Sequence, residues 1–253
     1  MKTIVFTNRA RFSGKTTSAI NIGAGLVRLG ARVLLIDLDH LGILTRGLGI
    51  VTQELRHTVY DLLAGAASLD EVLLVRGRTG IIPASHHLAG IELTMAQHPS
   101  PISLVGDFME KHSADLKKFD YIMFDTPSNL GFLTLNALAA SECAIVPVAV
   151  GTEALSGMEN VTRCIETVRN IYNSDLRLIG SVPILYDASS ADHLDSLVGI
   201  SDYFGDALFK TPVRTERAIS DALNTGYNIF EFNPDSQATS DYMNISEELV
   251  LRK

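Results

Sequence analysis

Residues 3–30 read TIVFTNRARFSGKTTSAINIGAGLVRLG and divide into three parts. Residues 3–7 are apolar or β-branched and predict a short strand. Residues 16–29 have the length and the apolar spacing of a helix, which Gly30 closes. The intervening residues form a loop at the carboxyl end of the strand, where open α/β sheets bind their ligands. This stretch therefore predicts an α/β fold with a ligand-binding loop after its first strand.

The same alternation continues along the chain, with short apolar runs between segments of helical length. Further strands are predicted at residues 33–36, 121–124, 144–148 and 178–185, and a weaker one at 207–209. Helices are predicted at residues 69–75, 102–117, 132–140, 154–172, 191–203, 216–224 and 240–251. The runs VLLI and YIMF are apolar on both faces, as in buried parallel strands. We expect a doubly wound, mostly parallel sheet with helices on both faces, as one domain over residues 1–253.

The composition restricts the class of protein. With 21 Lys and Arg against 29 Asp and Glu, the 253 residues carry a net charge of −8, so any contact with DNA needs a local basic patch. Cys143 and Cys164 are too few for a disulfide scaffold or a four-cysteine zinc site and are expected to be small buried side chains. Because no apolar run is long enough for a signal peptide or a membrane span, we expect a cytoplasmic protein.

The loop after the first strand carries the residues of a phosphate-binding site. Gly14-Lys15-Thr16 lies between a predicted strand and a predicted helix, as in the closing half of a phosphate-binding loop. Unpaired backbone N–H groups at a helix N-terminus favour an anion. Lys15 is expected to reach the β- and γ-phosphate oxygens, and the Thr16 hydroxyl to bind Mg²⁺. The motif in this position predicts a nucleotide site.

Carboxylates follow two other predicted strands. Asp37 and Asp39 stand at the exit of the VLLI strand, and Asp125 directly follows the YIMF strand. Because the carboxyl ends of parallel strands meet at one edge of a sheet, we expect these side chains to converge on the phosphates. An Asp after four apolar residues at a strand end is also what the Mg²⁺–water ligand of a P-loop ATPase requires.

These three signals resemble the ParA/MinD family of deviant-Walker ATPases, in particular its ParA (Soj-like) branch. The resemblance covers nearly the whole chain and includes TVYDLL (58–63), YIMFDTPSNLGFLTLNALAAS (121–141) and TERAISDALNTG (215–226). It implies a Mg²⁺- and ATP-dependent homodimer that sandwiches the nucleotide, binds DNA nonspecifically on the nucleoid and is reset by an adaptor that stimulates hydrolysis. Members of the family position plasmids, chromosomes or large protein assemblies.

The resemblance also implies roles for individual residues. Asp39 would orient or activate the attacking water, with Lys15 as the second catalytic residue. Thr16, Asp37 and Asp125 would support the metal and its waters, and Pro212 with neighbouring backbone would border the adenine. The residues that would hold the phosphates are Arg9, Arg11, Ser13, Gly14, Lys15, Thr16 and Thr17.

The loop departs from the pattern of this family. Where the family has Gly-Lys-Gly-Gly, with a signature lysine that contacts the partner's nucleotide, residues 9–12 read Arg-Ala-Arg-Phe. Glycine is used where the backbone approaches phosphate or takes a positive φ, so Arg11 and Phe12 conflict with the assignment. Either Arg9 or Arg11 replaces the charge of the lysine, or the loop has decayed and the site is slow or inactive. Two further departures are His40-Leu41, where Pro-Gln is usual, and Ile184, where a polar adenine contact is often seen.

Two other functions remain as alternatives. A MinD-like membrane-cycling ATPase needs a basic amphipathic C-terminal helix, but residues 240–253 carry three acidic residues against two basic ones, which disfavours a membrane. A nonhydrolysing structural or regulatory relative is the second alternative, because of the altered loop. Electron transfer of the nitrogenase-iron-protein kind needs cluster cysteines near the phosphate side, where neither cysteine lies.

Basic residues that could contact DNA are sparse. Lys210, Arg214 and Arg217 are the candidates, and the spacing of the two arginines puts them on one face of a helix. The competing interpretation is a solvated helix end on which these arginines pair with Glu216. The pair His86-His87 is expected in a surface loop rather than in a metal site, because no companion ligands have zinc spacing.

Overall fold

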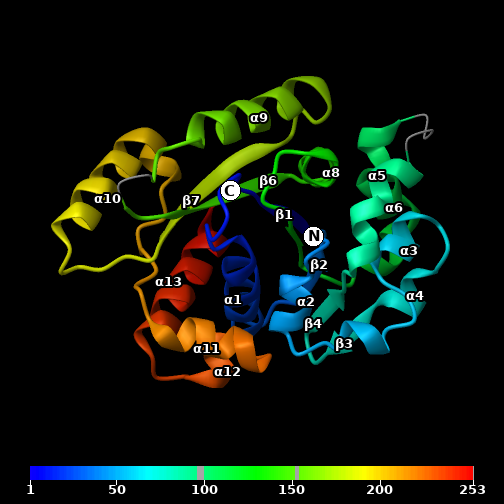
Figure 1. Ribbon diagram of the computed structural model, residues 1–253, viewed down its shortest axis with the longest axis horizontal. Coiled ribbons are helices and arrows are strands. Elements are labelled where there is room, and N and C mark those ends of the chain that lie inside the picture. The colour runs from blue at the N-terminus through cyan, green and yellow to red at the C-terminus, as the bar shows by residue number, and fades with distance from the viewer. Residues whose placement is uncertain (96–99, 152–153, 253) are drawn as a thin grey trace.

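The computed structural model describes residues 1–95, 100–151 and 154–252, so Lys253 of the tail lies outside the described residues. Its strands form a seven-stranded sheet in the order β3-β4-β2-β5-β1-β6-β7. All neighbouring pairs are parallel except β3 and β4, which are antiparallel. Figure 1 shows helices on both faces of this sheet. The predicted α/β fold with a mostly parallel, doubly covered sheet is therefore confirmed.

Five of the strands in the structure were predicted from the sequence, and two were not. The bounds are β1 Lys2–Phe6, β2 Val33–Asp37, β3 Leu74–Arg76, β4 Thr79–Ile82, β5 Tyr121–Asp125, β6 Cys143–Ala149 and β7 Arg177–Ile184. The hairpin of β3 and β4 was not predicted. The weaker strand expected at 207–209 is wrong, because residues 205–207 form the 3₁₀ turn η4 (Gly205–Ala207) and Leu208 makes only an isolated bridge to Ser181.

The helices are more numerous than predicted, and three of the predicted ones are shorter or divided. They are α1 Lys15–Arg28, α2 Ile43–Gly47, α3 Val59–Leu63, α4 Leu69–Val72, α5 Ile91–Thr94, α6 Leu104–Lys111, α7 Ser113–Leu116, α8 Phe132–Ala139, α9 Met158–Ile171, α10 Ala191–Phe204, α11 Arg217–Thr225, α12 Ile229–Phe232 and α13 Gln237–Leu251. The predicted helix 102–117 breaks at His112, and the predicted helix 154–172 begins only after Gly157, whose φ is 80°. The predicted helix 69–75 ends at Val72, and the chain continues as β3.

The sheet separates two apolar cores, since alternate residues of each strand face opposite sides. Val5 and Phe124 belong to one core, under α6, α8 and α9, whereas Ile4 and Met123 belong to the other, under α1 and α13. Helix α13 buries Ala238, Tyr242, Ile245 and Leu249 in this second core. The prediction that the apolar residues of the tail pack inside is therefore confirmed for Tyr242, Ile245 and Leu249, whereas Val250 and Leu251 are exposed. In the described residues, no helix is both long and apolar enough to cross a membrane.

Two glycines join the α2 side of the sheet to the C-terminal helices. Gly49, after α2, and Gly226, after α11, have φ values of 69° and 84°. A Cβ on Gly226 would lie 2.6 Å from the Cα of Gly49, and a Cβ on Gly49 would lie 3.3 Å from the carbonyl oxygen of Gly226. The two loops thus pack backbone against backbone, which a side chain at Gly226 would prevent and a side chain at Gly49 would strain.

Candidate nucleotide-binding site

The three signals found in the sequence meet at one edge of the sheet. Strand β5 lies between β1 and β2, and Asp125 is in register with both Phe6 and Asp37. The loop that follows β1 leads into the first turn of α1, so its phosphate-binding residues lie beside these two carboxylates. Ser13 and Lys15 are buried, and Thr16 and Thr17 are half-buried in that first turn. The sequence alone placed these groups together correctly.

The ammonium group of Lys15 is held inside the loop. Its Nζ donates a hydrogen bond to Ser128 Oγ at 2.9 Å and lies 3.4 Å from both the carbonyl oxygen of Ala10 and Ser13 Oγ. Burial lowers the pKa of Lys15, while the carboxylates of Asp125 and Asp39 raise it. A cation surrounded by loop oxygens and facing carboxylates is placed to meet phosphate.

Thr16 and Asp125 form the second half of the site. Thr16 Oγ1 donates to Asp125 Oδ2 at 2.7 Å, and Asp125 Oδ1 is buried without a partner among the described residues. The pKa of Asp125 is raised well above its usual range, first by burial and then by the neighbouring Asp37. A hydroxyl beside a carboxylate oxygen that lacks a partner fits Mg²⁺, which uses few protein ligands together with phosphate and water. Consistent with that, no three His, Cys, Asp or Glu side chains within the described ranges form a metal site of their own.

Asp37 has both carboxylate oxygens occupied by protein donors. Oδ1 accepts from the backbone N–H of Asp39 at 3.0 Å, and Oδ2 accepts from the N–H and the hydroxyl of Thr45 at 2.9 and 2.7 Å. Burial raises the pKa of Asp37 to about 6, although these hydrogen bonds oppose the shift. Thr45 Oγ1 also accepts from the N–H of Ala84, so Asp37 connects β2 to α2 and to the end of β4. Its predicted support of the metal stays a prediction, since in this structure it holds the segment 39–45.

Asp39 lies at the mouth of the site and is almost fully buried, with 6% of its surface exposed. Its Oδ1 accepts from the N–H of Leu41 at 3.0 Å, and His40 Nδ1 lies 3.4 Å from the same oxygen. The carboxylate is therefore oriented by its own loop, beside Lys15. This placement suits the role that the sequence suggested for Asp39, which remains a prediction.

The tip of the loop is exposed, and its backbone retains a glycine-like turn. Arg9, Ala10, Arg11 and Phe12 are all exposed, and the side chain of Phe12 is 90% exposed. Phe12 has φ 58°, in the left-handed region that costs an L-residue about 1–2 kcal/mol. The loop is thus held in the conformation for which glycine is normally used, with a phenylalanine in its place.

The ends of β6 and β7 lie on the other side of the phosphate loop from the carboxylates, which follow β2 and β5. Ile184, at the end of β7, covers the phosphate loop: a Cβ on Gly14 would lie 2.3 Å from Ile184 Cδ1. Leu185, the next residue, also has a left-handed φ of 58°. Pro212, predicted to border the adenine, lines a groove of about 990 Å³ between β7, α10 and α13, and its contact with the base stays a prediction.

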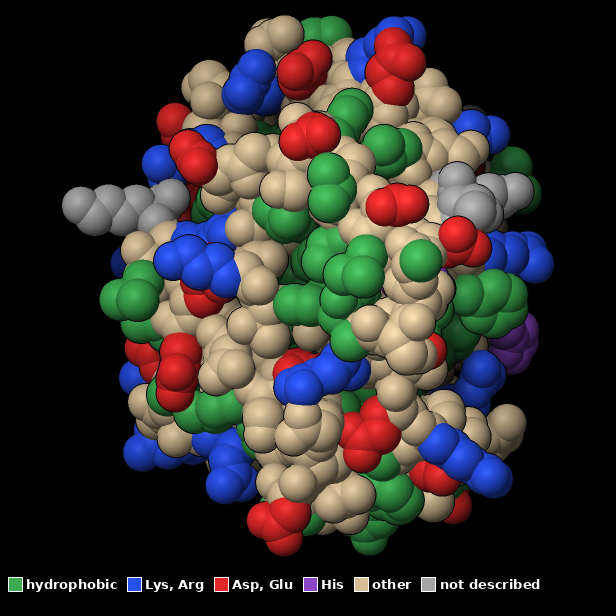
Figure 2. Space-filling model, turned by 90° about the vertical axis from the view of Figure 1, so that its left-hand side faces the viewer, with side chains coloured by type: hydrophobic (Ala, Val, Ile, Leu, Met, Phe, Trp, Pro, Cys, Tyr) green, Lys and Arg blue, Asp and Glu red, His purple; other side chains and the backbone are tan. Residues whose placement is uncertain are grey.

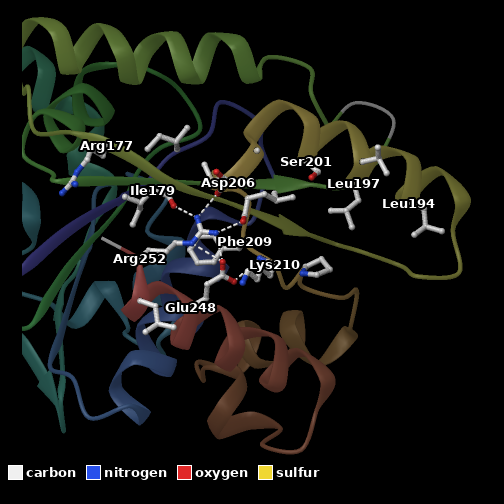
Figure 3. Close-up of a pocket in the computed structure, with 17 residues that line it drawn as sticks. Arg177, Ile179, Leu194, Leu197, Ser201, Asp206, Phe209, Lys210, Glu248 and Arg252 are labelled. Atoms are coloured by element: carbon white, nitrogen blue, oxygen red, sulfur yellow. Dashed lines mark hydrogen bonds and ion pairs between the residues drawn. The ribbon is translucent and has the colours of Figure 1, made fainter.

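Arg252 lines the same groove, beside Phe209 and Glu248 (Figure 3). The guanidinium of Arg252 donates to the carbonyl oxygens of Ala207 and Leu208 and lies 3.9 Å from the ring centroid of Phe209. Glu248 neutralises it from the preceding turn of α13. These contacts fasten the end of the chain to the outer edge of the sheet, away from the phosphate loop.

The three candidate DNA contacts differ in their surroundings. Arg214 precedes α11, so the prediction that it shares a helix face with Arg217 is wrong. Its Nε lies 3.0 Å from Asp241 Oδ2, with a second contact from Nη2 to Oδ1, so it does not form the alternative pair with Glu216. Arg217 is 90% exposed and lies 3.5 Å from Asp221 within α11. Lys210 is exposed beside the groove. On the face shown in Figure 2, basic and acidic side chains are interspersed around a central apolar area.

Two residues of the site were not assigned from the sequence. Ser128 lies in the segment after Asp125, which carries part of the family resemblance. Its position in that segment could have identified it as a site residue. Thr45 lies eight residues beyond Asp37 and belongs to no motif, and only the fold brings them together. His86 and His87, expected in a surface loop, are exposed and their rings lie 4.1 Å apart.

Comparison with known proteins agrees with this geometry. A family model described as an AAA domain (AAA_31) matches residues 1–178. The sporulation initiation inhibitor protein Soj of Bacillus subtilis is 32% identical, covering 98% of this chain and 98% of its own. The chromosome-partitioning ATPase Soj of Treponema pallidum is also 32% identical, covering 99% of this chain and 98% of its own. The crystal structure of cobyrinic acid a,c-diamide synthase from Mycobacterium smegmatis with bound ATP analog and magnesium has a TM-score of 0.87 at 29% identity, covering 99% of this chain and 94% of its own.

Proposed function

Because the chain belongs to the ParA/Soj family of ATPases, we propose that it uses Mg²⁺ and ATP to position or segregate a cargo. In the proposed cycle, ATP joins two copies, the dimer binds DNA nonspecifically, and an adaptor stimulates hydrolysis and releases the dimer. The cargo is a plasmid, a chromosome or a large protein assembly. The observation that carries the proposal is the joint position of Lys15, Thr16 and Asp125 at the first turn of α1.

Each part of the site has a task in this proposal. The N-terminus of α1 and Lys15 bind the phosphates, since backbone N–H groups and an ammonium both favour an anion there. Thr16 and Asp125 hold Mg²⁺, which neutralises phosphate charge when bound. Asp39 orients the attacking water, and its carboxylate is already fixed by the N–H of Leu41.

The exposed arginines support a working site with a replaced cation. The side chains of Arg9 and Arg11 have no hydrogen-bond or ion-pair partner in the described parts of the chain. They are therefore free to meet the phosphates of a second copy, and a guanidinium binds phosphate through two parallel N–H groups. We propose a dimer of this kind, with slow intrinsic turnover because the family's lysine is absent.

Calorimetric titration of ATP with Mg²⁺ tests the proposal at its first step. The parent protein is expected to bind ATP, and Lys15→Ala to lose about two orders of magnitude in affinity, because a buried cation that faces phosphate is removed. Lys111→Ala, which removes an exposed lysine at the end of α6, is the matched control and should bind as the parent does. If the parent binds no ATP, the second candidate function applies, a nonhydrolysing relative. That candidate is favoured by Arg11 and Phe12 in the loop.

Retardation of duplex DNA tests the later step. With ATP, the protein should retard any duplex at about 50 mM salt, and each phosphate neutralised should contribute a slope of roughly −0.9 in log K against log salt. Lys210 and Arg217 are the expected contributors, because the guanidinium of Arg214 is already engaged by Asp241. Absence of retardation with ATP would remove DNA from the proposed cycle while leaving ATP binding intact.

A further inference from the structure

An ion pair with a buried carboxylate joins the segment after the groove to the C-terminal helix. Arg214 donates to Asp241 Oδ2 through its Nε and its backbone N–H, each at 3.0 Å, and a third contact runs from Nη2 to Oδ1. Asp241 is fully buried, whereas the Arg214 side chain is 42% exposed. A planar guanidinium bound by both carboxylate oxygens fixes the relative orientation of the two side chains as well as their distance. A single point charge such as an ammonium fixes only the distance.

The same segment is fastened at two further places. Glu216 Oε2 accepts from the N–H of Ala238 at 2.8 Å, at the start of α13. On its other side, Val213 and Thr215 bond to the end of β7, through Tyr186 N–H to Val213 O at 3.0 Å and Thr215 N–H to Tyr186 O at 2.8 Å. Residues 213–216 are therefore held between β7 and α13.

Helix α13 in turn packs on α1, the helix that begins at the phosphate loop. Ser246 Oγ donates to the carbonyl oxygen of Ile22 at 3.3 Å, and Tyr242 is buried between the two helices. A continuous series of contacts thus runs from residues 213–216, through Asp241 and α13, to α1. The phosphate loop and this segment lie at opposite ends of the series.

The segment 213–216 lies on the base side of the site. The carboxylates of Asp37 and Asp125 occupy the β2 and β5 side of the phosphate loop. In the proposed ATP complex, with the phosphates in the loop, this leaves the ends of β6 and β7 for the base. Ile184 covers Gly14 from that direction, and Tyr186, which follows β7 on the same side, bonds to the segment.

We propose that Arg214 and Asp241 are positioning residues for the nucleobase. By fixing residues 213–216 relative to α1, the pair sets how tightly the base is bound while leaving the phosphates to the loop. This inference rests on the proposed ATP binding and adds to it the pair that determines affinity for the base.

The test compares a ligand that has a base with one that does not. ATP and inorganic tripolyphosphate, each with Mg²⁺, are titrated into the parent protein, Arg214→Lys and the double variant Arg214→Met/Asp241→Leu. The double variant replaces the buried charges by apolar side chains, which folded proteins tolerate better than one unpaired charge. Arg163→Lys, at an exposed arginine of α9 that pairs with Glu159, is the matched control. Cooperative thermal unfolding verifies that each variant is folded.

Both variants of the pair are expected to bind ATP about tenfold more weakly, with tripolyphosphate affinity unchanged within about twofold. Arg214→Lys should fail to rescue, because an ammonium keeps the charge but not the two parallel contacts. Equal loss for the two ligands, or no loss for either, overturns the inference and leaves the proposed function standing. If the parent binds neither ligand, the proposed function fails and the inference fails with it.

Discussion

Lys15 and Ser128 are joined by a 2.9 Å hydrogen bond, from the ammonium of the phosphate loop to a hydroxyl in the segment that follows β5. The contact bridges the loops after two adjacent strands, and the remaining oxygens near Nζ belong to Ala10 and Ser13 at 3.4 Å. An arriving phosphate must therefore compete with Ser128 for the lysine. The hydroxyl thus opposes nucleotide binding in this conformation.

Ser128→Ala should therefore tighten nucleotide binding. Net hydrogen bonds to charged groups contribute about 1.5–3 kcal/mol, and the half-exposed position of this one reduces the expected gain to about fivefold in affinity. Calorimetry with ATP and Mg²⁺ measures it, with Ser174→Ala, an exposed serine before β7, as the control. Weaker binding in Ser128→Ala would show that the hydroxyl contacts the nucleotide instead.

Asp39→Ala should preserve ATP binding and stop turnover. The proposed role of this carboxylate is to act on the attacking water, so the ground-state complex changes little while the rate falls by about 10²–10⁴-fold. Phosphate release under single-turnover conditions measures the rate, and calorimetry measures the affinity. Asp115→Ala, on the exposed helix α7, is the control. Unchanged hydrolysis in Asp39→Ala would remove this residue from the mechanism.

Arg11→Ala should reduce ATP-dependent dimerisation more than it reduces ATP binding by the monomer. Two nucleotides that face each other bring many negative charges into a water-poor interface, where a cation has a large effect. Light scattering with ATP gives the dimer fraction, and titration gives the affinity. Arg9→Ala is the second variant. If both variants dimerise as the parent does, the compensating charge lies outside this loop.

Phe12→Gly should stabilise the folded protein. Phe12 has a φ of 58°, and relief of that strain outweighs the extra chain entropy of glycine by about 1 kcal/mol or less. The free energy of unfolding in urea measures the gain. Phe12→Ala is the matched control, because it removes the exposed ring but keeps the Cβ that causes the strain. An equal gain in both variants would assign the effect to the ring rather than to the backbone.

Ionisation of Asp37 should destabilise the fold between about pH 4 and pH 6. Burial raises the pKa of this carboxyl to about 6 in the folded state, above its usual value of 3.8, so the folded state binds the proton more tightly than the unfolded state does. The contribution of Asp37 to the free energy of unfolding is complete below the unfolded-state pKa of 3.8 and is lost as the pH rises through the folded-state pKa of about 6. Relative to Asp37→Asn, the parent should lose about 3 kcal/mol over this range in metal- and nucleotide-free buffer. A constant difference between the two proteins would contradict the shift.

The first strand, its loop and α1 could be predicted because their information is local. An apolar run, Gly14-Lys15-Thr16 and a helix of good spacing follow one another, and parallel topology then brings Asp37 and Asp125 beside them. The contact of Thr16 with Asp125 spans 109 residues, yet it follows from placing two strand ends at one edge of the sheet.

The parts that escaped prediction depend on tertiary contacts. Ser68 begins α4 with a capping box, but the sequence has no glycine or proline that would end the helix at Val72. The helix ends there because the next residues pair with β4 and form β3. Arg214 and Asp241 belong to two separate segments, and no helical or strand repeat in the sequence relates their positions. The side chain of Arg214 therefore looked like one of two equivalent surface cations, although it is fastened to a buried partner.

The contact between Gly49 and Gly226 constrains how this sequence can diverge. Since a Cβ on Gly226 would lie 2.6 Å from the Cα of Gly49, a substitution at Gly226 requires the two loops to separate first, and one at Gly49 strains the same contact. The two positions are thus coupled through this contact, although 176 residues separate them along the chain. In a library that randomises both codons, selection for folding should recover glycine at both positions together. Any exception should carry a compensating change in one of the two loops, so the contact between the loops after α2 and α11 limits which pairs of residues this fold accepts.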